Sequence, residues 1–160
     1  MPTSPDRPCS ENVYLAGHLS LLLSSYQRLT GKSLLPATAS VFEAAKCAYE
    51  APFVILSHDT ESDPIFTYGN LSAQKLFELD WEELTRLPSR FSAELPNREE
   101  RARLLNLVNA QGYIDNYQGI RISKTGRRFL IRNAVVWNLI DASGSIHGQA
   151  ATFSNWELLR

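Results

Sequence analysis

The last third of the chain constrains the fold most, because it reads as three β-strands joined by two tight turns. The strands are predicted over residues 117–123, 128–140 and 146–156, and the polar segments Lys124–Arg127 and Asp141–Gly144 separate them. Each separating segment carries a glycine, which accepts the positive φ angles that hairpin turns require. Two hairpins in series form a meander, so this part of the sheet is predicted to be antiparallel.

The middle strand of the meander has apolar residues on both of its alternating faces. Side chains of a strand point alternately to opposite sides. One face is predicted to carry Phe129, Ile131, Asn133, Val135, Trp137 and Leu139, and the other Leu130, Arg132, Ala134, Val136, Asn138 and Ile140. A sheet with one face in water would alternate apolar and polar residues. Both faces of this sheet are therefore expected to be covered.

Two N-terminal helices are candidates for one of these covers. Residues 12–30 carry leucines and a tyrosine at spacings of three and four, which form one apolar stripe that ends before Gly31. Ser40 and Glu43 form a capping-box pattern that opens a second helix through Glu50. An amphipathic helix has to bury its apolar stripe, so we expect these helices to lie on the outer face of the sheet.

Two short strands and three helices are predicted between the N-terminal helices and the meander. The strands are expected at 53–57 and 64–69, and the helices at 70–78, 81–86 and 97–111, with Asn70, Asp80 and Asn97 as their N-terminal caps. The predicted fold class is α+β, with a five-stranded antiparallel sheet and helices folded against its inner face. We divide the chain into a helical extension, residues 1–51, and a domain, residues 52–160.

Composition argues against several broad classes of function. A net charge of -1 over 160 residues gives no overall attraction to nucleic acid or to an anionic membrane. No apolar run is long enough to span a membrane. Cys9 and Cys47 form neither a disulfide framework nor a metal-ligand spacing, which indicates a cytoplasmic setting. The expected partners are a small molecule and either a second copy of the chain or another protein.

Several local sequences resemble those of PAS domains. Tyr68-Gly69-Asn70, followed by Ala73-Gln74-Lys75-Leu76-Phe77, resembles the PAS junction between a strand and a helix. Trp81-Glu82-Glu83-Leu84 resembles the next PAS turn, and Ser123-Lys124-Thr125-Gly126 resembles the PAS hairpin with the pattern K-D-G. The last hairpin, from Asp141 to Gly148, resembles the final PAS pattern D-x-x-G-x-x-x-G. The resemblance covers residues 52–156.

A closer resemblance is to the bacterial MEKHLA-domain proteins. This PAS-related domain also occurs at the C-terminus of some plant homeodomain–leucine zipper regulators. The matching segments are residues 50–58, 64–70, 81–84, 119–123, 136–138 and 147–153. The resemblance implies a sensing or interaction module and does not specify a ligand.

Motifs for prosthetic groups of PAS relatives are missing from this sequence. Covalent flavin chemistry needs a cysteine within an Asn-Cys-Arg-Phe-like helix, and haem-binding relatives use a histidine on the long helix, residues 97–111. Neither residue is present there, so we expect no covalent flavin and no haem. His58 with Asp59, Glu61 and Asp63 has the ligand types of a divalent metal site. Loops between strands are usually polar because they are solvated, and we predict no metal.

Polar and aromatic residues inside the predicted strands are better candidates for a binding site. Buried polar groups need partners, which are either internal hydrogen bonds or a ligand. Aromatic walls with a few placed polar groups are typical of ligand cavities. The predicted ligand-binding residues are Tyr68, Asn70, Phe77, Tyr117, Arg121, Asn133, Trp137 and Gln149. Arg121 would favour a carboxylate or phosphate group on the ligand.

Three functional hypotheses follow, from different classes. The first is a stand-alone PAS-like sensory or regulatory module that binds a small molecule non-covalently and signals through protein association. The second is a protein interaction or dimerisation module with a filled core and no ligand. An enzyme is the least supported, since the sequence shows no nucleophile-base pair, metal motif or phosphate-binding loop. Ser57-His58-Asp59 is no catalytic triad, because neighbouring residues of an extended chain point to opposite faces.

Overall fold

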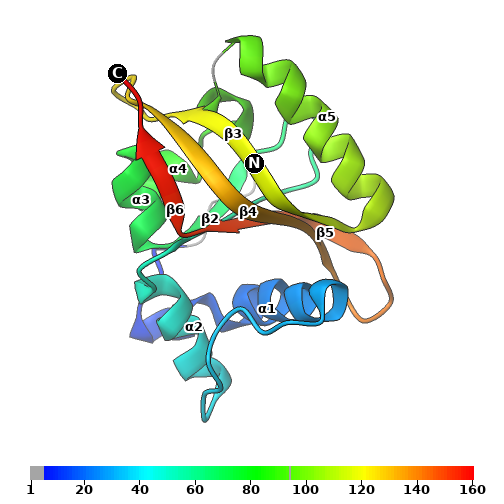
Figure 1. Cartoon of the computed structure of the whole chain (residues 1–160). Coiled ribbons are helices and arrows are strands. Elements are labelled where there is room, and N and C mark those ends of the chain that lie inside the picture. Colours follow the sequence, from blue (N-terminus) through cyan, green and yellow to red (C-terminus); the bar gives the residue numbers. More distant parts are fainter. Residues whose placement is uncertain (1–5, 94) are drawn as a thin grey trace.

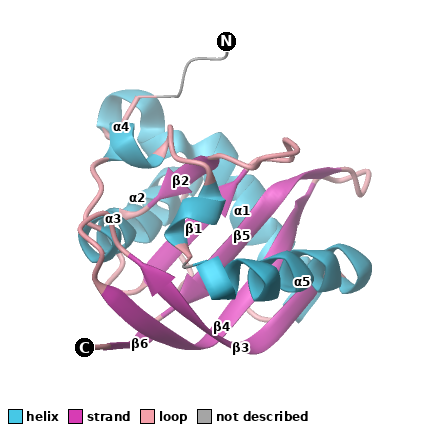
Figure 2. Cartoon of the chain, turned by 90° about the horizontal axis from the view of Figure 1, so that it is seen from above, coloured by secondary structure: helices cyan, strands magenta, loops and turns pink. Residues whose placement is uncertain are grey.

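An antiparallel sheet separates two layers of helices in the computed structural model of the chain (Figure 1). The structure describes residues 6–93 and 95–160, the latter range without the side chains of residues 95–98 and 101. Helices α1 (Ala16–Thr30) and α2 (Val41–Glu50) lie on one side of the sheet. Helices α3 (Leu71–Phe77), α4 (Trp81–Leu84) and α5 (Leu95–Gln111) lie on the other, which we call the inner side (Figure 2).

The sheet has the strand order β2-β1-β5-β4-β3, and every neighbouring pair is antiparallel. Its strands are β1 (Val54–His58), β2 (Phe66–Gly69), β3 (Tyr113–Ile122), β4 (Arg128–Ile140), β5 (Ile146–Phe153) and β6 (Asn155–Leu158). The predicted meander of β3, β4 and β5 and the α+β class are confirmed. The sixth strand arises because the predicted strand 146–156 breaks at Ser154, after which β6 continues alongside β4.

The outer helical layer begins with a turn that the sequence pattern did not predict. Residues Ser10–Leu15 form a short 3-10 segment, η1, in which Val13, Tyr14 and Leu15 have positive φ angles of 51–57°. The α-helix predicted from residue 12 therefore begins only at Ala16. Its side chains Leu19 and Leu22 are fully buried against the sheet, so the predicted outer cover is present.

Local signals at the other helix ends agree with the structure. Ser40 Oγ accepts a hydrogen bond from the backbone N–H of Glu43 and caps α2. Asp80 and Glu83 form a capping box at α4. Helix α5 ends before Gly112, as predicted. The predicted Asn97 cap of α5 lies outside the described side chains.

Strand β4 changes faces part-way along, which corrects the strict alternation predicted for it. Asn133 has a φ of 53°, and the register between β3 and β4 shifts beside it. Phe129, Ile131 and Ala134 therefore all face the inner core, whereas Trp137 faces the outer one. An extra residue in a strand, a β-bulge, produces this exchange.

Candidate ligand-binding cavity

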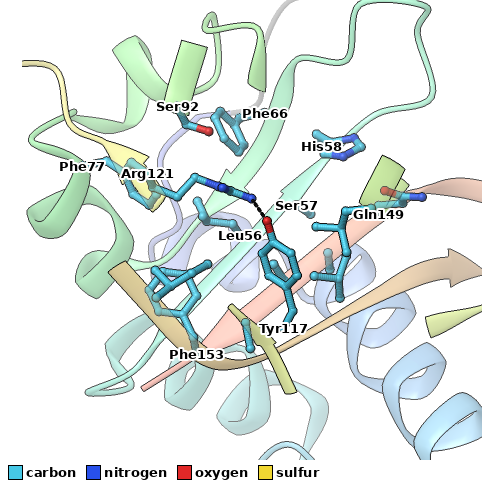
Figure 3. Close-up of a pocket in the computed structure, with 16 residues that line it drawn as sticks. Leu56, Ser57, His58, Phe66, Phe77, Ser92, Tyr117, Arg121, Gln149 and Phe153 are labelled. Carbon is cyan, nitrogen blue, oxygen red and sulfur yellow. Dashed lines mark hydrogen bonds between the residues drawn. The ribbon is translucent and has the colours of Figure 1, made fainter. Parts of the chain in front are cut away.

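A small cavity of about 70 Å³ lies on the inner side of the sheet (Figure 3). Five strands, α3, α5 and the 3-10 turn Ser89–Ser92 (η2) supply its walls. Most of the lining is apolar, and its aromatic rings are those of Phe66, Phe77, Phe153 and Tyr117. A largely apolar hollow with a few polar groups has the composition of a small-molecule site.

Arg121 is the cationic group of this cavity. It lies on β3, its side chain crosses toward Tyr117 in Figure 3, and only 8% of the residue is exposed. One guanidinium nitrogen donates to Ile120 O at 2.9 Å and the other terminal nitrogen to Tyr117 Oη at 3.1 Å. Within the described part of the chain, no carboxylate forms an ion pair with it. A buried charge without a counter-ion is costly, so this arginine calls for an explanation.

The ring of Tyr117 lies in space that is free because residue 119 is a glycine. A Cβ atom at Gly119 would lie 2.4 Å from Tyr117 Oη and 2.9 Å from Cζ. Such distances are too short for real contacts, so any larger residue at position 119 would displace the ring. The tyrosine also stacks beside the guanidinium, with Arg121 Cζ 5.5 Å from the ring centroid. Gly119 therefore leaves the space that the Tyr117 ring occupies, and that ring in turn contacts Arg121.

Gln149 and Asn138 form a pair of buried amides at the other end of the site. They are directly opposite on β5 and β4, and each is at most 5% exposed. Gln149 Nε2 donates to Asn109 Oδ1 at 2.9 Å and to Leu105 O at 3.4 Å, and Asn138 Nδ2 donates to Val108 O at 3.3 Å. These bonds hold α5 over the sheet. The oxygens Gln149 Oε1 and Asn138 Oδ1 have no hydrogen-bond partner among the described residues.

An open hollow of about 150 Å³ adjoins the cavity. Its walls come from the loop after β1 and from α5, and it shares His58 and Gln149 with the cavity. These two side chains therefore form the boundary between the interior site and the surface.

The structure brings four of the eight predicted ligand-binding residues together around the cavity. They are Phe77, Tyr117, Arg121 and Gln149. That they bind a ligand stays a prediction. The other four lie elsewhere.

Tyr68 and Asn70 are structural residues of the core. Tyr68 is fully buried on the outer side, where its ring contacts Trp81 at 5.8 Å between centroids, and burial raises the pKa of its hydroxyl. Asn70 Oδ1 accepts from the N–H groups of Ile55 and Ala73, and its Nδ2 donates to two backbone carbonyls. The side-chain oxygen and nitrogen of Asn70 are thus both hydrogen-bonded. These bonds cap α3 and connect that helix to β1.

Trp137 and Asn133 lie away from the cavity because of the bulge in β4. Trp137 is fully buried against α1, where its Nε1 donates to Leu22 O at 3.2 Å and its ring meets Tyr26 edge-on. Asn133 is exposed at the bulge itself. Strict alternation placed both on the face of Phe129, and the extra residue breaks that alternation.

The sequence reasoning missed other residues of the cavity wall. Leu56, Phe66 and Phe153 lie on strands whose alternation predicts an inward direction, so the pattern could have identified them. Ser92 belongs to the irregular segment between α4 and α5 and carries no comparable signal.

The acidic loop after β1 holds itself together with its own hydrogen bonds. Asp59 Oδ1 accepts from the backbone N–H groups of Glu61 and Ile65, and Asp63 pairs with Arg90 at 3.0 Å. Within residues 6–93 and 95–160, no three His, Cys, Asp or Glu side chains gather in a metal-binding arrangement. In the same ranges, no helix is both long enough and apolar enough to cross a membrane.

Comparison with known proteins identifies the family. The sequence model of the MEKHLA domain matches residues 16–158. The chain belongs to the MEKHLA domain family. The matched region of this MEKHLA domain includes both helices of the outer layer. Its relatives include the homeobox-leucine zipper protein HOX9 of Oryza sativa, in the subspecies indica and japonica, at 24% identity over 139 residues.

That alignment covers 86% of this chain but 16% of HOX9. This MEKHLA domain thus spans about a sixth of the length of these plant relatives, and they give no support to a bacterial origin. Among solved structures it is similar to the PAS domain of a Colwellia psychrerythraea protein, with a TM-score of 0.62 and 14% identity over 73% of this chain and 94% of that one. A light-oxygen-voltage domain studied with a flavin analogue gives a TM-score of 0.58 and 13% identity, over 74% of this chain and 85% of that one. These similarities show a PAS-like fold.

Proposed function

We propose that this MEKHLA domain is a sensory module that binds a small molecule non-covalently in the inner cavity and signals through protein association. The observation that supports it most is the buried guanidinium of Arg121, which faces a hollow and has no carboxylate partner among the described residues. A filled structural core gains nothing from an unpaired charge. A binding site gains affinity from such a charge, because the ligand supplies the missing partner.

The size of the cavity favours a small ligand over a flavin. A cavity of about 150 Å³ holds one benzene molecule, and the cavity here is about 70 Å³. The three fused rings of a flavin do not fit in that space. The free cysteines Cys9 and Cys47 lie outside the cavity lining, at the start of η1 and within α2. The residues present therefore do not fit a covalently bound flavin, and we propose neither flavin nor haem.

We propose that a structural change at the cavity reaches the outer helices through the strands of the sheet. β4 and β5 contribute residues to the cavity wall, and β4 also carries Trp137, which bonds to α1. Ser25 of α1 adds two hydrogen bonds to the backbone of Ile140, at 3.0 and 2.8 Å. A ligand that shifts these strands would change the position of α1, and through it the surface that other proteins meet.

One surface of the outer layer has the character of an association site. Val13, Val41 and Phe42 are exposed by 46%, 56% and 37%, and the Phe42 ring contacts Tyr14 at 5.6 Å between centroids. This surface also supports the alternative proposal, an interaction or dimerisation module without a ligand. In both proposals the partner is a protein, either a second copy of this chain or a different chain. We also propose a cytoplasmic setting.

Native mass spectrometry of the purified full chain distinguishes the two proposals. A sensory module is expected to retain a small added mass, or to gain one when incubated with a panel of metabolites. The filling variant Ala134→Val narrows the cavity from its floor and should reduce this added mass, whereas the surface variant Arg132→Gln should keep it. An unliganded dimer that accepts no molecule from the panel would support the interaction module instead.

A further inference from the structure

We propose that the ligand of the cavity is a short monocarboxylate of the size of acetate or propionate. The inference rests on the function proposed above and specifies its ligand class. It starts from the hydrogen-bonding capacity of Arg121. A guanidinium has five N–H donors, and two of them are used, by Ile120 O and Tyr117 Oη. The other three of the five N–H donors therefore remain for a ligand.

The geometry of these donors favours a planar anion. The arginine fork matches a carboxylate with two parallel hydrogen bonds, and such charge-assisted bonds are about twice as strong as neutral ones. Tyr117 Oη already accepts from Arg121, so its own proton is free to be donated to a ligand oxygen. A carboxylate placed there receives bonds from both side chains of the β3 wall.

The remaining walls limit what is attached to the carboxylate. Leu56, Phe66, Phe77 and Phe153 line much of the rest of the site and offer no hydrogen bonds to a ligand from their side chains (Figure 3). Two polar side chains beside them have their donors engaged, since Ser92 Oγ donates to Ser89 O and Gln149 Nε2 donates to Asn109 Oδ1 and Leu105 O. A phosphate or sulfate group would leave oxygens facing these rings without donors, which is unfavourable in an apolar site. A short alkyl chain instead removes its own apolar surface from water. The walls therefore select a carboxylate with an apolar tail over an inorganic anion.

The volume sets the length of that tail. The cavity is about half the size of the cavity of about 150 Å³ that holds the six carbons of benzene, so by that scale it encloses about three heavy atoms, and slightly more where it meets the adjoining hollow. Acetate has four and propionate five. Longer or branched acids would require the boundary formed by His58 and Gln149 to open.

Titration of the 15N-labelled full chain with sodium propionate, followed by NMR, tests this inference. Propionate should shift the backbone amide signals of residues 117–121 and 149–151 in a saturable manner. Propionamide, which has the same shape without the charge, and inorganic phosphate should each bind at least 10-fold more weakly. Sodium chloride at equal ionic strength is the control for non-specific effects.

Two cavity variants and one surface variant complete the test. Arg121→Gln should weaken propionate binding at least 10-fold, and Tyr117→Phe should weaken it less while retaining the fold. Arg132→Gln, which changes an exposed arginine on the neighbouring strand, should bind propionate as the parent does. Should Arg121→Gln fail to fold, Tyr117→Phe and propionamide still decide the result.

The outcomes separate this inference from the function on which it rests. Equal binding of propionate and propionamide, or unchanged binding in both cavity variants, would overturn the carboxylate assignment and leave the sensory function standing with a neutral ligand. If neither these compounds nor a metabolite panel perturbs residues 117–121 and 149–151, both proposals are wrong.

Discussion

The imidazole Nε2 of His18 lies 2.9 Å from Ser57 Oγ, and the same oxygen lies 2.8 Å from Thr67 Oγ1. This chain of hydrogen bonds joins α1 to β1 and β2. The neighbours of Ser57 on β1 are Leu56 and His58, which line the cavity on the opposite face of the strand. The contact therefore connects the outer helix to the strand that forms a cavity wall.

Acid should destabilise the protein through His18. Burial lowers the pKa of this imidazole from 6.5 to about 4. Between these two pH values the unfolded chain takes up a proton that the folded protein excludes, so the contribution of His18 lowers the free energy of unfolding as the pH decreases, and this contribution levels off below pH 4. The full loss is about 3 kcal/mol. Urea unfolding from pH 7 to pH 4 measures it, and an equally steep loss in His18→Gln would contradict the assignment.

A side chain at position 148 should disrupt the pairing of β1 with β5. The φ angle of Gly148 is +156°, and a Cβ atom there would lie 2.2 Å from the carbonyl oxygen of His58. Because the obstacle is backbone, Gly148→Ala is expected to lower the free energy of unfolding by roughly 2 kcal/mol or more. The matched control is Gly17→Ala in α1, where no atom lies within 4 Å. It should raise stability by about 0.5–1 kcal/mol, so the two alanines are expected to act in opposite directions.

Replacement of the cavity arginine by an apolar residue of similar length should not weaken the unliganded fold. Arg121→Met removes a buried charge that has no counter-ion among the described residues. Replacement of a buried ion pair by apolar residues of similar volume is often neutral or stabilising by about 1–4 kcal/mol, and an arginine without a counter-ion has no pairing energy to lose. Thermal unfolding of ligand-free protein checks this expectation. A melting temperature lowered by many degrees would show that the guanidinium serves the fold instead of a ligand.

Removal of residues 1–39 should expose the outer face of the sheet and cause unfolding or aggregation. The deletion takes away Leu19 and Leu22, which are fully buried, together with the helix that covers Trp137. A graded version is Leu22→Ala, with an expected loss of about 2–5 kcal/mol. The half-buried Leu23 provides the comparison, since Leu23→Ala should cost less. A truncated protein that remains soluble at the parent melting temperature would contradict this role of α1.

The features that depend on local sequence could be predicted, and those that depend on an irregular backbone could not. Turn glycines and apolar alternation were sufficient for the antiparallel meander, and caps such as Ser40 and Asp80 located helix starts. Half of the predicted ligand-binding residues lie outside the cavity lining, in part because one residue, Asn133, adopts a positive φ within a strand. Asparagine tolerates that conformation better than most residues, but nothing in the neighbouring sequence requires it. Asn70 was assigned correctly as a cap, and its buried position reflects that role.

The bulge at Asn133 also determines which side chains of β4 face the cavity and which face α1. Removal of one residue there would restore regular alternation, so that every side chain from Ala134 to Ile140 would exchange sides. Trp137, which pairs with Ala150 of the cavity lining, would then face the inner side, where its indole is larger than the cavity of about 70 Å³, while Val136 would replace it beneath α1. We therefore expect deletion of Asn133 to remove the cavity, and chains of this family that lack the extra residue should have no space for a ligand there.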